Sequence, residues 1–369
     1  TVRVNKSSFN IREKLSELGR KFGLTGSELA AAETVQEARD LVSVGRRNIL
    51  INGDYRINQR GSSGALSTSG DFVADRWRGY KYLTSSLSTV VGDNSISAIE
   101  TTGCAKRLNI TLTNGSNGYN LIGQRIENSV KELSGKTVTI SFWYYTNEQR
   151  KFSVELLQYF GSGGSTTVRG IGAKPTEVSA TGAWTKFTQT VTIPTVSGKT
   201  ISDGYMEFAI WLSDAENLVN SGYLGQQPNG TFYITAIQLE AGRNATDFEH
   251  RSYGEELALC QRYCQMIPNN AVSSRIAMGT WSSATTARVT CFLRTTMRNT
   301  PTVHSVPGRG NMLREAIGWY AVSSDPSITE SSNDVVTFYF NNSITSSGAS
   351  ANEIATWGNG AKIVIESEL

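Results

Sequence analysis

The sequence has few of the residues that build metal sites and catalytic triads. Its 369 residues include four cysteines, at positions 104, 260, 264 and 291, and two histidines, His250 and His304. No CxxC pair occurs and the histidines are far apart in the sequence, so a tetrahedral zinc site is not expected. We interpret all four cysteines as small buried hydrophobic residues. We expect no metal, no cofactor and no Ser-His-Asp set.

Charge and long apolar runs are also scarce. Charged residues make up 18% of the chain, and 35 basic against 32 acidic residues leave a net charge of +3. No stretch concentrates lysine or arginine, which argues against nucleic-acid binding. No run of about 18 apolar residues occurs, and the opening TVRVNKSSFNIREKL lacks the apolar core of a signal peptide. We therefore expect no membrane insertion, and assembly in a cytoplasm.

Hydrophobic residues, at 38%, suffice for real cores, and the abundance of Gly, Ser, Thr and Asn favours strands and turns. Short alternating runs separated by turn residues lie at 48–53, 106–113, 136–146, 151–160, 184–193, 205–213 and 231–241, and again at 287–297, 301–306, 316–322, 334–341 and 361–368. Many short strands of this kind predict a mainly β fold, with an antiparallel jelly-roll sandwich in the first group.

Alternation within two of these runs predicts which side chains share a face. In 136–146 the residues Val138, Ile140, Phe142 and Tyr144 are expected on one face. In 231–241 one face would carry Phe232, Ile234, Ala236 and Gln238, and the other Tyr233, Thr235, Ile237 and Leu239. Each sheet is therefore expected to present one face to the core and one away from it.

Changes of pattern along the chain predict four parts. Residues 1–47 carry two short amphipathic helices that lack the apolar surface to fold alone, which predicts an attachment arm; a flexible or loosely packed arm is the alternative. Residues 48–252 are the predicted jelly-roll, and residues 253–268 a connector helix. Residues 269–369 are predicted to form a second, small β-sandwich at the tip.

The connector helix is predicted to begin after Ser252, with Glu255 in the capping-box position. An apolar stripe would carry Tyr253, Leu257, Cys260 and Cys264, and one short helix between two sandwiches has little else to bury it. We expect these four residues to form an oligomer interface near a symmetry axis. A helix lying flat on its own sandwich is the alternative.

Three stretches resemble a known class of proteins. RRNILINGDYRINQRG at 46–61 and FVADRW at 72–77 resemble an opening found in many bacteriophage tail-fibre and virion-associated proteins. ITAIQLEAGRNATDFEHRSYGEELALCQRYCQ at 234–265 resembles the matching close, and the two ends frame a jelly-roll similar to carbohydrate-binding modules. The arm at 1–47 resembles, more weakly, the leader of fibre proteins of short-tailed marine phages.

This resemblance implies a virion protein, a tail-fibre or spike subunit that engages glycans on a host cell surface. It implies a homotrimer, attached through residues 1–47 to a tail adaptor, portal or capsid protein. A capsid decoration or tail-assembly protein with purely architectural contacts is the alternative. Enzymatic activity is not expected: carboxylates such as Glu155 and Asp203 could meet across strands, but the long repeats of parallel β-helix spikes are absent.

Aromatic residues are the candidate carbohydrate-binding groups. Tyr80 and Tyr82 share one face of a predicted strand, and Trp143 lies in a strand with aromatic residues on both faces. Packing against other elements or a neighbouring subunit is the alternative for all three. Trp77 is predicted to be a core residue, with Asp75 paired to a nearby arginine, rather than a sugar platform.

Acidic residues around the predicted last strand of the sandwich are candidate ligands for a structural calcium ion, namely Glu240 and Glu249 with His250 beside them. Acidic residues are too scattered along this sequence to define such a site. Packing pairs that tie the connector helix to the sandwich are the favoured interpretation.

Overall fold

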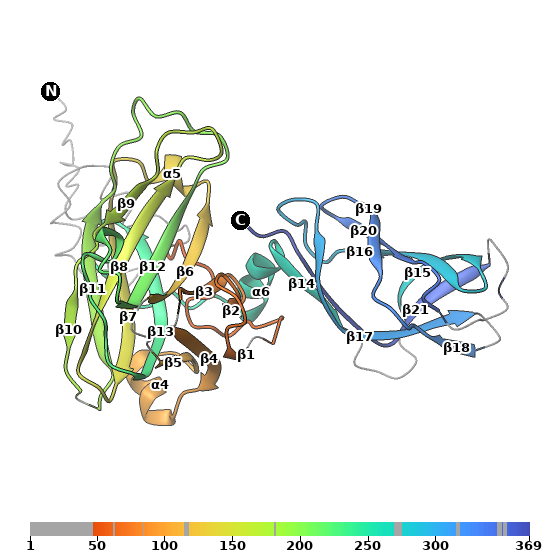
Figure 1. Ribbon diagram of the computed structural model, residues 1–369, viewed down its shortest axis with the longest axis horizontal. Helices are drawn as coiled ribbons and strands as arrows, with labels where there is room; N and C mark the ends of the chain where they lie inside the picture. The colour runs from red at the N-terminus through yellow and green to blue at the C-terminus, as the bar shows by residue number, and fades with distance from the viewer. Residues whose placement is uncertain are drawn as a thin grey trace, which may run out of the picture.

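The computed structural model describes residues 47–61, 63–83, 85–113, 118–180, 182–268, 275–314, 318–344, 349 and 353–369. The predicted helical arm at 1–47 lies outside these residues except for Arg47. The described chain is mainly β, as predicted, and consists of a two-sheet sandwich followed by a third sheet (Figure 1). Among the described residues, no helix combines the length and apolar composition needed to cross a bilayer.

The sandwich consists of two antiparallel sheets. Across the first sheet the strands are β1 (Ser63–Ala65), β4 (Ser86–Asp93), β5 (Lys106–Thr113), β13 (Gly230–Ala241), β7 (Thr137–Thr146) and β11 (Thr185–Thr192). Across the second they are β10 (Thr176–Val178), β8 (Arg150–Tyr159), β12 (Tyr205–Asp214), β6 (Tyr119–Glu127), β3 (Trp77–Lys81) and β2 (Phe72–Ala74), with β9 (Val168–Ile171) paired to β8. Neighbours in each sheet are often distant in sequence, as in a jelly-roll.

Alternating side chains from both sheets fill one core. Val138, Ile140 and Phe142 of β7 point into it, as predicted, and meet Phe152 of β8 and Phe208 of β12. Trp77 is fully buried in the same core, which confirms its predicted structural role. Burial of such large side chains supplies most of the driving force for the fold.

The predicted faces of β13 hold only for its first half. Phe232 and Ile234 are in the core, but Ile237 and Leu239 follow them there in place of Ala236 and Gln238. A β-bulge, where the register against β7 shifts between Thr235 and Gln238, inserts an extra residue and reverses the alternation. Residues 48–53 were also wrongly predicted as a strand: they form bends and turns, with Asn52 at a positive φ of 58°.

Short helices lie within the connections of the sandwich. They are α4 (Ile96–Thr102), α5 (Ser129–Glu132) and the 3₁₀ turn η1 (Val219–Ser221). Helix α4 begins at Ser95, whose hydroxyl accepts a hydrogen bond from the backbone of Ala98, and ends at Gly103 in the left-handed conformation with φ at 74°. Only glycine adopts this conformation without strain, so Gly103 fixes how the chain leaves the helix.

The C-terminal part forms one sheet around its own core. Its strands in order are β18 (Gly318–Ala321), β17 (Thr302–Arg314), β21 (Ile354–Glu366), β15 (Arg275–Ser283), β16 (Thr286–Phe292), β20 (Val335–Phe340) and β19 (Ser327–Ser331), and β14 (Cys264–Pro268) pairs with β21. The sheet bends so far that β19 contacts β17 from the other end of the order. It thereby encloses Trp281, Phe338, Phe340 and Trp357.

Helix α6 (Tyr253–Gln261) begins with the predicted capping box, in which Ser252 and Glu255 satisfy each other's backbone groups. It ends at Gln261, and the expectation of a helix to residue 268 was wrong because Cys264–Pro268 is strand β14. Tyr253 is 60% exposed and Leu257 is half-buried, whereas Cys260 and Cys264 are buried within their own chain. These two cysteines therefore present no surface to another copy, contrary to our expectation.

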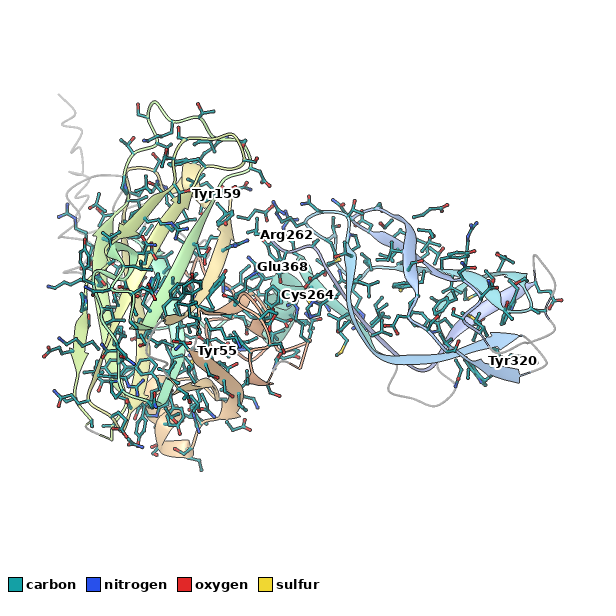
Figure 2. All side chains as sticks on the ribbon, in the orientation of Figure 1. Tyr55, Tyr159, Arg262, Cys264, Tyr320 and Glu368 are labelled. Atoms are coloured by element: carbon teal, nitrogen blue, oxygen red, sulfur yellow. The ribbon has the colours of Figure 1, made fainter. Side chains whose placement is uncertain are left out.

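Arginines of the sandwich form ion pairs with carboxylates at the end of the C-terminal sheet. In Figure 2, the labels of Glu368, Arg262 and Cys264 mark this junction. The guanidinium of Arg60 lies 2.9 Å from a carboxylate oxygen of Glu366 and 3.0 Å from one of Glu368, and Arg76 also pairs with Glu368. Burial raises the pKa of Glu366, but hydrogen bonds from His304 and Arg60 outweigh it and hold the pKa at about 2. Buried ion pairs thus tie the two β bodies together.

Candidate functional site

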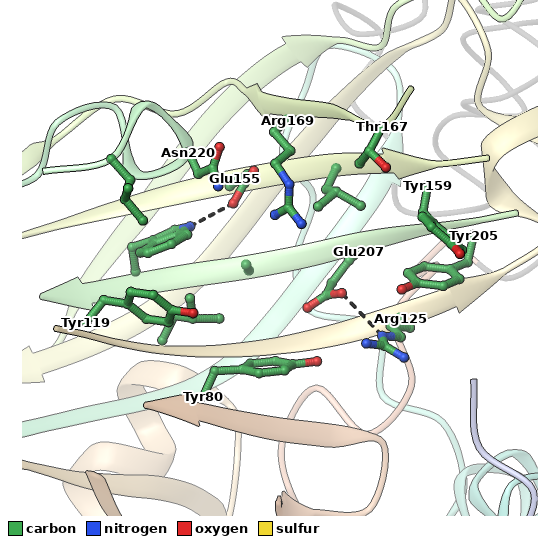
Figure 3. Close-up of a pocket in the computed structure, with 15 residues that line it drawn as sticks. Tyr80, Tyr119, Arg125, Glu155, Tyr159, Thr167, Arg169, Tyr205, Glu207 and Asn220 are labelled. Atoms are coloured by element: carbon green, nitrogen blue, oxygen red, sulfur yellow. Dashed lines mark hydrogen bonds and ion pairs between the residues drawn. The ribbon is translucent and has the colours of Figure 1, made fainter. Parts of the chain in front are cut away.

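A groove of about 550 Å³ lies on the outer face of the second sheet (Figure 3). Its lining residues are Tyr80, Tyr119, Leu121, Arg125, Glu155, Leu157, Tyr159, Thr167, Arg169, Tyr205, Glu207, Ala209, Trp211, Leu218 and Asn220. Its volume is in the range of pockets that hold small ligands.

Strand alternation places these side chains in the groove. In β12 the residues Phe208 and Ile210 enter the core, so that Glu207, Ala209 and Trp211 between them face outward. The neighbouring strand β8 follows the same rule, with Glu155, Leu157 and Tyr159 facing the groove. The surface of the groove is therefore a direct consequence of the pattern that builds the core.

Small residues make the floor of the groove low in its middle. Gly123 of β6 pairs with Ala209 of β12, and Ala209 pairs with Glu155 of β8 on its other side. A Cβ atom on Gly123 would lie 2.9 Å from the carbonyl oxygen of Phe208, closer than real Cβ contacts, so no larger residue fits there. The floor of the groove therefore carries almost no side-chain volume where Gly123 and Ala209 lie side by side.

Aromatic rings stand at both ends of this low floor. At one end Tyr119 and Trp211 are 5.3 Å apart between ring centroids, with Tyr80 beside them. At the other end Tyr159 and Tyr205 are 4.8 Å apart. Flat apolar faces with polar edges, such as these tyrosines offer, suit ligands that have apolar faces and hydroxyl-rich edges.

Charged groups lie between the aromatic ends. Glu155 accepts hydrogen bonds from the indole of Trp211 at 2.8 Å and the backbone N–H of Gly170 at 2.9 Å. Burial raises the pKa of Glu155, although these two hydrogen bonds act in the opposite direction. Glu207 pairs with Arg125 at 3.3 Å between Oε2 and Nε. Both carboxylates are therefore held in place by partners of the protein.

Two further polar groups reach into the groove. The guanidinium of Arg169 extends into it from β9, between Glu155 and Tyr159 in Figure 3. The hydroxyl of Tyr80 is buried next to Glu207 but makes no hydrogen bond of good geometry within the described chain. Of these two groups, the exposed Arg169 guanidinium is the one that a ligand in the groove can reach directly.

The structure separates the three aromatic residues proposed from the sequence. Tyr80 lines the groove, and Tyr82, which is 48% exposed, stacks on Tyr119 at its rim with 5.3 Å between centroids. Trp143 belongs to β7 of the other sheet, where it pairs with Lys186 of β11 and lies outside the groove. Trp143 therefore does not share a site with Tyr80.

The other lining residues were missed by sequence reasoning. A usable signal existed in YMEFAIWLS, where Glu207, Ala209 and Trp211 alternate with core residues. The carboxylates weighed for calcium are instead packing groups: Glu240 accepts hydrogen bonds from Thr246, and Glu249 pairs with Arg251 at 3.1 Å. The favoured interpretation of these two carboxylates agrees with the structure.

Comparison with known proteins gives several likenesses that each cover about half of the chain. No curated protein matches the chain. Among solved structures, a CBM4 module is 18% identical over 52% of this chain and 98% of its own, with a TM-score of 0.29. The family 11 carbohydrate-binding module from Clostridium thermocellum, in complex with a β-1,3-1,4-mixed-linked tetrasaccharide, is 11% identical over 50% of this chain and 99% of its own, with a TM-score of 0.29.

A bacteriophage protein is also among the similar structures. The enzymatically active domain of tailspike protein 4 from bacteriophage CBA120 is 9% identical over 53% of this chain, with a TM-score of 0.31, and this chain covers 21% of it. One family model matches part of the chain: residues 65–216 are similar to the carbohydrate binding domain family. The matched segment lies within the two-sheet sandwich.

Proposed function

We propose that this chain binds glycans in the groove of the second sheet and serves, without catalysis, as a fibre or spike subunit of a bacteriophage particle. The observation that supports glycan binding most strongly is the groove itself. Its low floor lies between aromatic ends, and all lining residues except Leu218 and Asn220 fall within the segment that matches the carbohydrate binding domain. The virion role is supported by the resemblance of residues 46–77 and 234–265 to phage fibre proteins.

Alanine at Tyr159 is expected to weaken glycan binding by at least about tenfold, equivalent to about 1.4 kcal/mol. Tyr159 is half-buried at one end of the groove, so its ring can be removed with little loss of core packing. Binding of the full chain would be measured first on an array of bacterial surface polysaccharides, and then by titration with the best ligand.

Two variants on the other sheet serve as matched controls. Tyr145 of β7 contacts Tyr233 at 5.4 Å outside the groove, and Tyr145→Ala should leave affinity unchanged. Trp143→Ala tests the earlier hypothesis directly, because a loss of binding there and not at Tyr159 would place the site on the first sheet. A chain that binds none of the polysaccharides would favour the architectural role, as a capsid decoration or tail-assembly protein.

The proposal includes a homotrimer attached through residues 1–47 to a tail adaptor, portal or capsid protein. Repeated weak sites on one particle would give high avidity, and projecting fibres are closed cyclic oligomers. Within α6, Tyr253 is the exposed candidate contact and Leu257 is half-buried beside it.

Light scattering of the full chain at micromolar concentration should give three times the chain mass of 40.2 kDa. Leu257→Asp is then expected to dissociate the trimer, because a carboxylate cannot be buried in an apolar contact without a partner. A monomeric wild-type chain at this concentration would contradict the trimer, and so would a Leu257→Asp variant that lost stability but kept its mass.

A further inference from the structure

Asp54, Cys104 and His250 meet at one place on the sandwich although they are far apart in the sequence. One possible ligand atom from each, a carboxylate oxygen, the sulfur and a ring nitrogen, lie within 4.8 Å of one another. Asp54 and Cys104 are buried, and His250 is exposed. The cluster is outside the groove and plays no part in the proposed glycan binding.

The backbone brings the three residues together through unusual conformations. Asp54 lies in the turn between Asn52 and Tyr55, both of which have positive φ. Cys104 directly follows Gly103, the left-handed end of α4, and a Cβ atom on Gly103 would lie 3.1 Å from Nε2 of His250. Glycine at 103 therefore serves both the turn and the close approach of the imidazole.

Groups around the cluster resemble the outer partners of metal ligands. The guanidinium of Arg56 donates a hydrogen bond to Oδ2 of Asp54 at 2.5 Å and another to the carbonyl oxygen of Arg251 at 2.9 Å. Metal-binding carboxylates are commonly oriented in this way. Burial raises the pKa of the Cys104 thiol to about 12, although the side chain of Thr235 and the backbone N–H of Ala236, at the bulge of β13, act in the opposite direction.

We propose that Asp54, Cys104 and His250 bind one Zn²⁺ ion. Sulfur, nitrogen and oxygen donors together are the set that zinc prefers, whereas calcium takes six to eight oxygens. Tetrahedral bonds of about 2.0–2.3 Å place ligand atoms roughly 3.3–3.8 Å apart, so a small movement of the exposed His250 closes the site. Solvent reaches His250 and can supply the fourth ligand.

The proton and the charges of this step can be followed group by group. When the Zn–S bond forms, the Cys104 thiol releases its proton to solvent, and the thiolate and the Asp54 carboxylate together neutralise Zn²⁺. The Arg56 guanidinium, which donates a hydrogen bond to Asp54, then leaves one net positive charge beside the site, and this side chain is 22% exposed to solvent. The ion would join the turn before β1, the end of α4 and the segment after β13, three parts of the sandwich that share no strand pairing.

Titration of the reduced, metal-free full chain with Zn²⁺ should show one ion bound per chain, and Zn²⁺ should raise the midpoint of thermal unfolding. Co²⁺ in place of Zn²⁺ should give a sulfur-to-cobalt charge-transfer absorption that Cys104→Ser abolishes. His250→Ala should weaken Zn²⁺ binding by more than about tenfold, because even outer partners of metal ligands account for 10–100-fold. Cys291→Ala, a cysteine buried in the other β body, is the control and should change nothing.

His250→Ala is the decisive variant because an exposed side chain can be removed without unfolding the protein, even if Cys104→Ser fails to fold. Unchanged Zn²⁺ affinity in His250→Ala would overturn the proposal. So would a wild-type chain that does not bind Zn²⁺ at micromolar concentration, or one that Ca²⁺ stabilises equally and that keeps this response in His250→Ala. Glycan binding is measured separately, so its failure and the failure of the zinc site are distinguishable.

Discussion

Replacing Trp77 by alanine is expected to lower the free energy of unfolding by about 3–5 kcal/mol, the usual cost of removing a fully buried large aromatic side chain. The ring is 0% exposed and contacts Tyr55 and Phe208, at 5.4 and 6.0 Å between centroids. Its indole N–H donates a hydrogen bond of 2.8 Å to the carbonyl oxygen of Asn52. The variant therefore leaves a cavity and removes one of two hydrogen bonds to this carbonyl, which keeps only the bond from the backbone N–H of Tyr55 at 3.1 Å.

Urea unfolding followed by circular dichroism would measure this loss. Trp77→Phe keeps most of the packing and loses the hydrogen bond, so it should fall between wild type and alanine. Trp143→Ala, on the outer face of the first sheet, is the matched control and should cost less because this ring is only half-buried. A Trp77→Ala chain that kept its stability and lost glycan binding would instead support the platform role that the sequence left as the alternative.

The second large effect is expected at the junction of the two β bodies, where Arg60→Ala should cost about 3–5 kcal/mol. The Arg60 side chain is 2% exposed and pairs with Glu366 and Glu368, while Asp75 lies 3.8 Å away. Burial already raises the pKa of Asp75 against the opposing influence of Arg60. Without the guanidinium, buried Asp75 loses its ion-pair partner. Within the described chain, Glu366 then keeps only His304 as an ion-pair partner, and Glu368 keeps only Arg76.

Thermal unfolding of the Arg60→Ala chain should also divide into two transitions, because the ion pairs that couple the bodies are weakened. Lys151→Ala is the control: it removes one partner of an exposed pair with Glu177, at 3.0 Å, and should change stability by less than about 1 kcal/mol. Equal effects of the two variants would show that the buried network contributes no more than a surface pair.

Local pattern was enough to predict many of the strands, because period-two alternation is visible within each run and the sandwich core follows from it. It did not give all of them: 48–53 is not a strand, and β4, β6 and β15 were not among the predicted runs. Val138, Ile140 and Phe142 entered the core as expected, and so did Trp77. The predictions failed where the local structure departs from a regular strand or helix, so that the expected periodicity no longer holds. The bulge at Ala236 reversed the faces of β13, and β14 took residues that continued the apolar stripe of α6.

The site was only partly predictable, because it depends on which strands become neighbours. Tyr80 and Trp143 are equally aromatic in the sequence, but they belong to different sheets, and strand order is set by the tertiary fold. Glu155 reaches Trp211 across 56 residues of chain. The sequence also argued against zinc because the cysteines and histidines lack motif spacing, whereas Asp54, Cys104 and His250 are brought together only by the folded sandwich.

Contacts between the first turn of the sandwich and α6 mean that the sandwich cannot be completed until the ribosome has made α6. The backbone N–H of Asn52 donates to the carboxylate of Glu256, which lies 204 residues later, and Arg251 bonds to the carbonyl oxygens of Asn48 and Leu50. At about 5–20 residues per second, a ribosome makes Glu256 roughly 10–40 s after Asn52. During that interval the nascent chain has its opening turn but lacks its hydrogen bonds with Arg251 and Glu256, and chaperones would meet a sandwich whose two ends are not yet joined.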